Sequence, residues 1–241
     1  NLLFKNVNVK RDKTLEKQGE NIHFYSEFLY NFNMPLLKSG QTYDSIIDPK
    51  ISLRYSPTDT RNVSDLERRL DTTNIFNLDR IMTEAADVET LEGGESLNLG
   101  LGYTLIENET LREKLNIELA QVFRFEENLD LPETNNIGAK TSDLIGNITF
   151  STGDLIDLNY NFALDSDLKG REYDSLDLGI TVNKLVTSFE YLDDQVGKDK
   201  NRTLKTDLKY NFTNNHSLLF SRRENKKINL TEYNNIIYEY K

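Results

Sequence analysis

The chain has 241 residues, of which 37% are hydrophobic and 29% charged, so its length allows one large β domain or two modest domains. Its formal net charge of −11 repels nucleic acid and anionic membrane surfaces, which argues against a DNA or RNA partner. Cysteine is absent, and this excludes disulfides and thiolate metal sites in the chain.

Alternation of apolar and polar residues with a period of two predicts strands along almost the whole chain. In chain order, the apolar stripes fall within residues 2–10, 22–32, 51–55, 97–105, 115–125, 156–164, 176–182, 185–191, 204–212, 216–220 and 236–240. Many of these segments have about 9–11 residues, the length of a β-strand that crosses a bilayer. Helical spacing is confined to residues 63–73, which are too few to form a domain and are predicted to form a loop turn.

The stretch ESLNLGLGYTLI, residues 95–106, shows the two faces of such a strand. Because successive side chains point to opposite sides, one face is apolar and the other is polar or bare. In a membrane barrel the apolar face contacts lipid and the other lines the lumen. The predicted lipid-facing residues are Leu97, Leu99, Leu101, Tyr103, Leu158, Tyr160, Phe162, Leu208 and Tyr210. The predicted lumen-facing residues are Asn98, Gly100 and Gly102.

The connections between the predicted strands alternate in length. Tight turns are predicted at 151–154, 183–184 and 213–215, whereas 56–72, 126–141, 165–173 and 223–233 are longer and charged. Short turns at one end and long loops at the other are typical of outer-membrane barrels. We therefore predict an all-β, antiparallel up-and-down transmembrane β-barrel, of which roughly a dozen strands are present. The alternative is a soluble β-sandwich, in which the same stripes would pack against a second sheet.

An ordered set of motifs runs from residue 46 to residue 165. IIDPKISLRYSP (46–57) ends in YSP, and AQVFRFEEN (120–128) and TSDLIGNITF (141–150) follow later in the chain. Between them a loop motif consists of Phe76, Asp79, Arg80, Glu92, Gly93 and Gly94. This order and spacing resemble the LPS-assembly protein LptD (OstA) family. A second Gly-x-Asp-Arg motif of that family is missing, because residues 82–89 retain only its acids.

The resemblance implies that residues 1–241 are part of the C-terminal β-barrel domain of this family, without the N-terminal periplasmic jelly-roll domain and the last barrel strands. Both ends of the sequence read as strands, so we expect a piece of a longer chain. The implied function is an outer-membrane translocon that inserts lipopolysaccharide into the outer leaflet in a Gram-negative cell. The implied partners are lipopolysaccharide, outer-membrane lipids, an LptE-type lipoprotein plug, and the periplasmic Lpt bridge that is reached through the N-terminal domain.

The loop motif is interpreted as structural rather than catalytic. Asp79 and Arg80 beside Glu92 would form charge-assisted hydrogen bonds that pin a long loop at the barrel mouth. Glycines such as Gly93 and Gly94 permit backbone angles that are closed to other residues. On the predicted lumen face, Gly100 and Gly102 would allow close approach of the plug, although a bend in a curved sheet explains them equally well.

No catalytic, cofactor or metal site is predicted, and the chain is not expected to be an enzyme. DSDLKG (165–170) begins like a calcium loop, but Lys169 replaces a ligand and Leu176 stands where a closing glutamate is required. His216 and Ser217 are adjacent, so they point to opposite faces and cannot form a catalytic pair. Another outer-membrane barrel, such as a porin or receptor, and a membrane enzyme are further alternatives.

Overall fold

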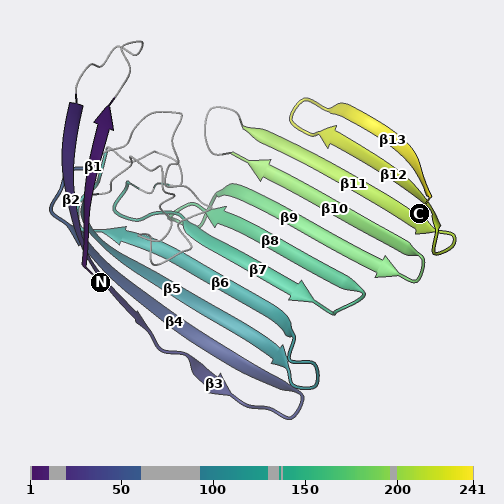
Figure 1. Cartoon of the computed structure of the whole chain (residues 1–241), viewed down its shortest axis with the longest axis horizontal. Coiled ribbons are helices and arrows are strands. Elements are labelled where there is room, and N and C mark those ends of the chain that lie inside the picture. Colours follow the sequence, from purple (N-terminus) through teal and green to yellow (C-terminus); the bar gives the residue numbers. More distant parts are fainter. Residues whose placement is uncertain are drawn as a thin grey trace. The chain divides into compact units, whose positions relative to one another are not determined.

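The computed structural model describes residues 2–10, 20–60, 93–129, 136, 138–195 and 200–240. The regular elements of this part of the chain are β-strands (Figure 1). In chain order they are β1 (Leu2–Lys10), β2 (Glu20–Asn33), β3 (Leu36–Lys38), β4 (Tyr43–Ser56), β5 (Gly94–Glu107), β6 (Glu113–Arg124), β7 (Leu144–Ser151), β8 (Ile156–Leu164), β9 (Arg171–Val182), β10 (Leu185–Asp194), β11 (Asn201–Asn211), β12 (His216–Asn225) and β13 (Leu230–Tyr240).

These strands form one antiparallel sheet in which neighbours in sequence are neighbours in space (Figure 1). The order is β1-β2-β4-β5-β6-β7-β8-β9-β10-β11-β12-β13, and the short β3 pairs with β4 beside this path. The result confirms the predicted all-β, antiparallel up-and-down architecture. In the described part of the chain, this order of paired strands begins at β1 and ends at β13.

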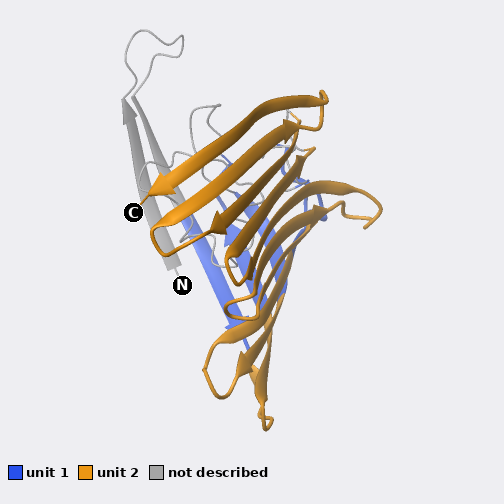
Figure 2. Cartoon of the chain, turned by 90° about the vertical axis from the view of Figure 1, so that its right-hand side faces the viewer, with its two compact units in different colours: residues 1–33, 50–100, 121–142 blue, residues 34–49, 101–120, 143–241 orange. Residues whose placement is uncertain are grey.

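The chain divides into two compact units, each of which is described by itself (Figure 2). Unit 1 comprises residues 1–33, 50–100 and 121–142, and therefore includes the ends of β4, β5 and β6 that adjoin the long connections. Unit 2 comprises residues 34–49, 101–120 and 143–241, and includes β7 to β13. No helix in the described ranges is long and apolar enough to cross a membrane.

The three predicted tight turns are confirmed. Gly153 in the β7–β8 turn has a φ of 92°, and Asn183 in the two-residue β9–β10 turn has a φ of 52°. Glycine and asparagine tolerate these left-handed conformations better than other residues do. In the β11–β12 turn, the Thr213 hydroxyl accepts hydrogen bonds from the backbone N–H groups of Asn215 (3.2 Å) and His216 (3.1 Å). Turn chemistry of this kind fixes the register of each hairpin.

The sequence prediction was wrong in one connection and missed two strands. Residues 223–233 were predicted as a loop, but β12 continues to Asn225 and β13 begins at Leu230. The strands β3 and β7 were not among the predicted stripes, since β3 has only three residues and Gly146 interrupts the apolar stripe of β7. The predicted turn at 63–73 lies outside the described residues.

Successive hairpins of unit 2 are staggered along the strand direction. The last pair of the β7–β8 hairpin is Thr152 with Ile156, whose backbone groups are bonded at 2.9 Å. Ile156 pairs with Ile180 in β9. The β9–β10 hairpin continues two residues beyond Ile180, and its last pair is Val182 with Leu185. The end of one hairpin therefore projects two residues beyond the end of the previous one.

The next hairpin repeats this step. Leu185 pairs with Tyr210 in β11, and the β11–β12 hairpin continues two residues to Phe212 and His216, whose backbones are bonded at 2.9 Å. Two residues are about 6.6 Å along a strand, and two strand spacings are about 9.6 Å, so the line of turns is inclined by about 35°. This inclination is the strand tilt that barrels require.

Candidate functional site

The strands of unit 1 expose apolar side chains and bury polar ones. On one face of β2 and β4 the exposed residues are Phe28, Tyr30, Phe32, Ile51, Leu53 and Tyr55. Of the residues that alternate with them, Asn31 is exposed, whereas Leu29 and four polar residues are buried: Glu27, Ser52, Arg54 and Ser56. A water-soluble protein has the opposite distribution, because its apolar side chains are the ones removed from solvent.

The strand β5 shows the same distribution at the residues singled out from the sequence. Leu99 and Leu101 are exposed, and Leu97 and Tyr103 are half-buried. On the opposite face Asn98 and Gly102 are buried and Gly100 is half-buried. The structure thus places the predicted lipid-facing and lumen-facing residues of β5 on opposite faces of the strand.

The predicted lipid-facing residues of β8 and β11 share the apolar face of unit 2. Leu208 and Tyr210 are exposed, whereas Leu158, Tyr160 and Phe162 are half-buried. The rings of Tyr160 and Phe162 stack with their centroids 5.4 Å apart. Phe162 also lies on Gly146, its pairing partner in β7, so closely that a Cβ atom there would come within 2.0 Å of the phenyl Cζ. A glycine at this position lets the aromatic ring lie flat against the sheet.

The opposite face of unit 2 carries a ladder of polar side chains that runs across the strands. Lys205 Nζ lies 2.7 Å from the Glu190 carboxylate and 3.1 Å from the Asp207 carboxylate. Further along the ladder, the Asn147 amide donates hydrogen bonds to Asn159 (2.9 Å) and Asn161 (2.7 Å). Such contacts keep a polar wall ordered while it remains compatible with water.

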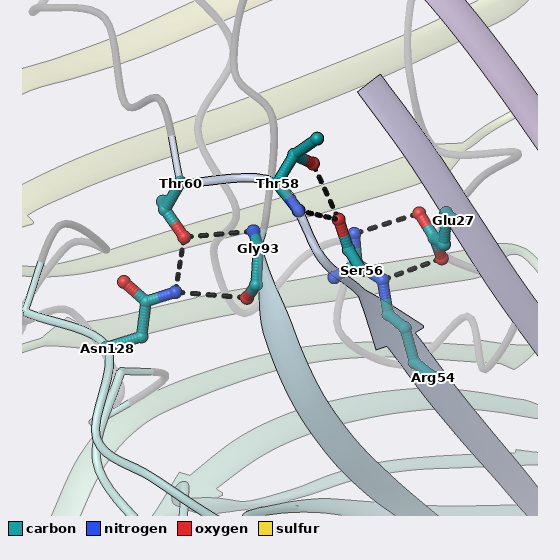
Figure 3. A network of polar contacts seen from close by, with 7 residues as sticks. All are labelled: Glu27, Arg54, Ser56, Thr58, Thr60, Gly93 and Asn128. Carbon is teal, nitrogen blue, oxygen red and sulfur yellow. Dashed lines mark hydrogen bonds and ion pairs between the residues drawn. The ribbon is translucent and has the colours of Figure 1, made fainter. Parts of the chain in front are cut away.

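A buried ion pair joins the polar faces of β2 and β4 (Figure 3). Arg54 Nε donates to Glu27 Oε1 at 2.6 Å, and Arg54 Nη2 donates to Glu27 Oε2 at 3.0 Å. The side chains are only 6% and 1% exposed, respectively. Because Arg54 pairs with Leu29, Glu27 occupies the diagonal position two residues away, where a long side chain can reach it. The two-point contact satisfies both oxygens of the carboxylate.

A cluster of loop residues lies in unit 1 where β4 ends and β5 begins (Figure 3). The Gly93 N–H donates to the Thr60 hydroxyl at 2.9 Å, and the Asn128 amide donates to the Gly93 carbonyl at 3.2 Å and to Thr60. A Cβ atom on Gly93 would lie 1.9 Å from the Thr58 carbonyl oxygen, so only glycine fits there. Gly94, the first residue of β5, has a φ of 91°. Four residues of the predicted loop motif, Phe76, Asp79, Arg80 and Glu92, lie outside the described residues.

Asp174 and Asp193 are among the carboxylates on the apolar face of unit 2, and the sequence analysis missed both. Asp174 in β9 accepts a hydrogen bond from the Tyr160 hydroxyl and lies 3.5 Å from Arg171. Its pairing partner in β10, Asp193, forms an ion pair with Arg202 at 2.6 Å. In each strand the acid is the next residue on the apolar face beyond the last apolar one, at the strand end that adjoins a longer loop. The alternation of side chains along the strand could therefore have placed both acids on this face.

In the segment 165–170, which begins like a calcium loop, a lysine side chain pairs with one of the carboxylates. Lys169 Nζ lies 2.6 Å from Asp167 Oδ2, and this ammonium holds the pKa of the Asp167 carboxyl below its usual value. Within the described ranges, no group of three or more histidine, aspartate or glutamate side chains could hold a metal ion. His216, the first residue of β12, bonds the Tyr238 hydroxyl through Nδ1.

Strands with exposed apolar residues, buried polar residues and staggered hairpins are typical of β-barrel membrane proteins. The family model described as LptD: LPS transport system D matches residues 6–222. The chain therefore belongs to the LptD family, which confirms the resemblance found in residues 46–165, and its general role is the transport or assembly of lipopolysaccharide. This is a transport family and not a known enzyme family. A search of curated proteins gave no match.

Proposed function

We propose that this chain forms part of the wall of an outer-membrane translocon that inserts lipopolysaccharide into the outer leaflet. In this proposal the apolar face of the sheet contacts bilayer hydrocarbon and the polar face lines an aqueous lumen. The observation that carries it is the reversed burial in β2 and β4, where Phe28 and Tyr55 are exposed while Glu27 and Arg54 are buried. Exposed aromatic residues in such numbers would be unfavourable in water but are suited to a bilayer.

The connections support an orientation for the wall. In outer-membrane barrels the short turns face the periplasm and the longer loops face the exterior. The turns at 152–155, 183–184 and 212–215 would then be periplasmic, and the connections 57–93 and 125–143 would be extracellular. The loop cluster around Gly93 would accordingly lie at the outer mouth of the barrel, where the motif from Phe76 to Gly94 would pin the loop.

The proposed route for the lipid follows from the division between the two faces. A periplasmic domain, reached through the Lpt bridge, would deliver the lipid, the sugar part would enter the lumen, and the acyl chains would leave sideways between strands. A wide lumen requires many strands, of which this chain would supply part as barrel wall. An LptE-type lipoprotein would occupy the lumen, and Asn98, Gly100 and Gly102 on the polar face of β5 would approach it.

Depletion of the gene in a Gram-negative cell tests this proposal. The expected result is a loss of lipopolysaccharide from the cell surface and its accumulation inside the envelope, with recovery when the wild-type gene is restored. A porin or receptor would instead change the uptake of a solute and leave surface lipopolysaccharide at its normal level. Unchanged surface lipopolysaccharide after depletion would therefore contradict the transport proposal.

A further inference from the structure

Unit 1 contains a cavity of about 640 Å³ at the loop ends of β4, β5 and β6. Its lining comes from three segments that are far apart in the sequence, residues 55–60, 93–95 and 124–129. The volume lies within the range of small-molecule binding sites and corresponds to a few sugar rings. The proposed orientation of the wall puts this cavity on the extracellular side, where transported material leaves the lumen.

Hydrogen bonds between the three segments hold the lining in place (Figure 3). Thr60 and Asn128 both bond Gly93, at 2.9 Å to its N–H and 3.2 Å to its carbonyl oxygen. The hydroxyl groups of Ser56 and Thr58 are bonded to each other at 2.7 Å. A site whose polar groups are already fixed loses little conformational entropy when a ligand binds. The cavity is therefore organised before any ligand arrives.

The charge of the lining favours one class of ligand. Among the described lining residues there are four carboxylates, Asp59, Glu95, Glu126 and Glu127, and one guanidinium, that of Arg124. The resulting formal balance of −3 repels phosphate and carboxylate groups. Ionised carboxylates only accept hydrogen bonds, and threonine and serine hydroxyls both accept and donate. Such a lining suits a neutral ligand with many hydroxyl groups.

We propose that this cavity binds an uncharged saccharide of the transported glycolipid. The inference rests on the proposed transport of lipopolysaccharide, which carries both sugars and phosphate groups. Sugar hydroxyls donate to the carboxylates of the lining, and the apolar faces of sugar rings contact Pro57 and Phe125. Phosphorylated parts of the molecule are repelled, so the cavity selects sugar units that bear no phosphate.

The test uses the whole protein in detergent and saturation-transfer difference NMR. The probe is the oligosaccharide of lipopolysaccharide freed of its lipid, compared before and after removal of its phosphate groups. We expect the dephosphorylated oligosaccharide to bind at least about threefold more tightly, because the negative lining no longer opposes it. Asn128→Ala, which removes two of the bonds that join the segments, should weaken this binding about tenfold. The matched control, Asn214→Ala in the exposed β11–β12 turn, should bind as the wild type does.

A charge reversal in the lining tests the preference for the dephosphorylated oligosaccharide. A misfolded variant would lose binding of both oligosaccharides, whereas this variant is expected to reverse the preference. Glu126→Lys with Glu127→Lys gives three cations against two carboxylates, a formal balance of +1. This variant should prefer the phosphorylated oligosaccharide, the reverse of the wild type. Three results would overturn the saccharide site. The wild type could bind the phosphorylated form more tightly, or the Asn128→Ala variant could bind the dephosphorylated oligosaccharide as tightly as the wild type does. The third result is a wild type that binds calcium but neither oligosaccharide. Surface lipopolysaccharide, measured in strains that carry these variants, would then show whether the proposed transport function is retained.

Discussion

Breaking the ion pair between Glu27 and Arg54 should destabilise the protein strongly. The two side chains are 1% and 6% exposed and share two hydrogen bonds, at 2.6 and 3.0 Å. Removal of one partner leaves the other charge buried and uncompensated, which typically costs about 3–5 kcal/mol. Two charge-assisted hydrogen bonds at about 1.5–3 kcal/mol each give a similar sum. We therefore expect Glu27→Leu and Arg54→Met each to lower the free energy of unfolding by about 3–5 kcal/mol.

A double-mutant cycle separates the pair from its surroundings. The variant with both substitutions should be more stable than either single variant, because two apolar side chains replace a desolvated pair without leaving a lone charge. The assay is urea unfolding of the whole protein in lipid vesicles, at low and at high salt. The coupling should exceed about 3 kcal/mol and resist salt, since buried charges are poorly screened.

The exposed ion pair between Lys169 and Asp167 provides the matched control. Its side chains are 82% and 48% exposed, so its coupling should be much smaller than that of the Glu27–Arg54 pair and should fall with salt. A coupling below about 1 kcal/mol for the Glu27–Arg54 pair, or one that disappears in salt, would refute the reasoning that this pair is buried in the wall.

Three further substitutions have expected outcomes in the same unfolding assay. Gly146→Ala should cost about 1–3 kcal/mol, because its Cβ atom meets the Phe162 ring; no change would mean that the ring does not lie there. Leu101→Arg should cost about 2–4 kcal/mol if Leu101 faces hydrocarbon, and a neutral result would place it in water. Tyr160→Phe should cost about 1–2 kcal/mol, since it removes a hydrogen bond from the buried Asp174; equal stability would show that this bond is not formed in the membrane.

The strands and turns could be predicted because their signals are local. Alternation along residues 95–106 and 156–164 follows from the opposite directions of successive side chains, and a turn such as Asn183–Lys184 needs only two residues. The separation of apolar and polar residues onto the two faces of each strand could be predicted from the sequence for the same reason. The sequence alone could not decide whether the apolar face meets lipid or a second sheet, and the exposure of these side chains on β2 and β4 favours the proposed contact with lipid.

Contacts between strands could not be predicted because they depend on register. The Glu27–Arg54 pair exists because Leu29 stands opposite Arg54, and a shift of one residue would turn the two side chains to opposite faces. The missed ends of β12 and β13 have a different cause. Arg222, Arg223 and Glu224 put charges on both faces of β12, so alternation disappears although backbone pairing continues.

The most direct test of the central claim is a cysteine scan along β11, because this chain has no cysteine of its own. Spin labels would be attached at Asp207, Leu208, Lys209 and Tyr210 of the whole protein in a bilayer. Labels at Leu208 and Tyr210 should be relaxed mainly by oxygen, which concentrates in hydrocarbon, and those at Asp207 and Lys209 mainly by a water-soluble nickel complex. Preferential relaxation of the Leu208 and Tyr210 labels by nickel, or their protection from both reagents, would contradict a lipid-facing wall.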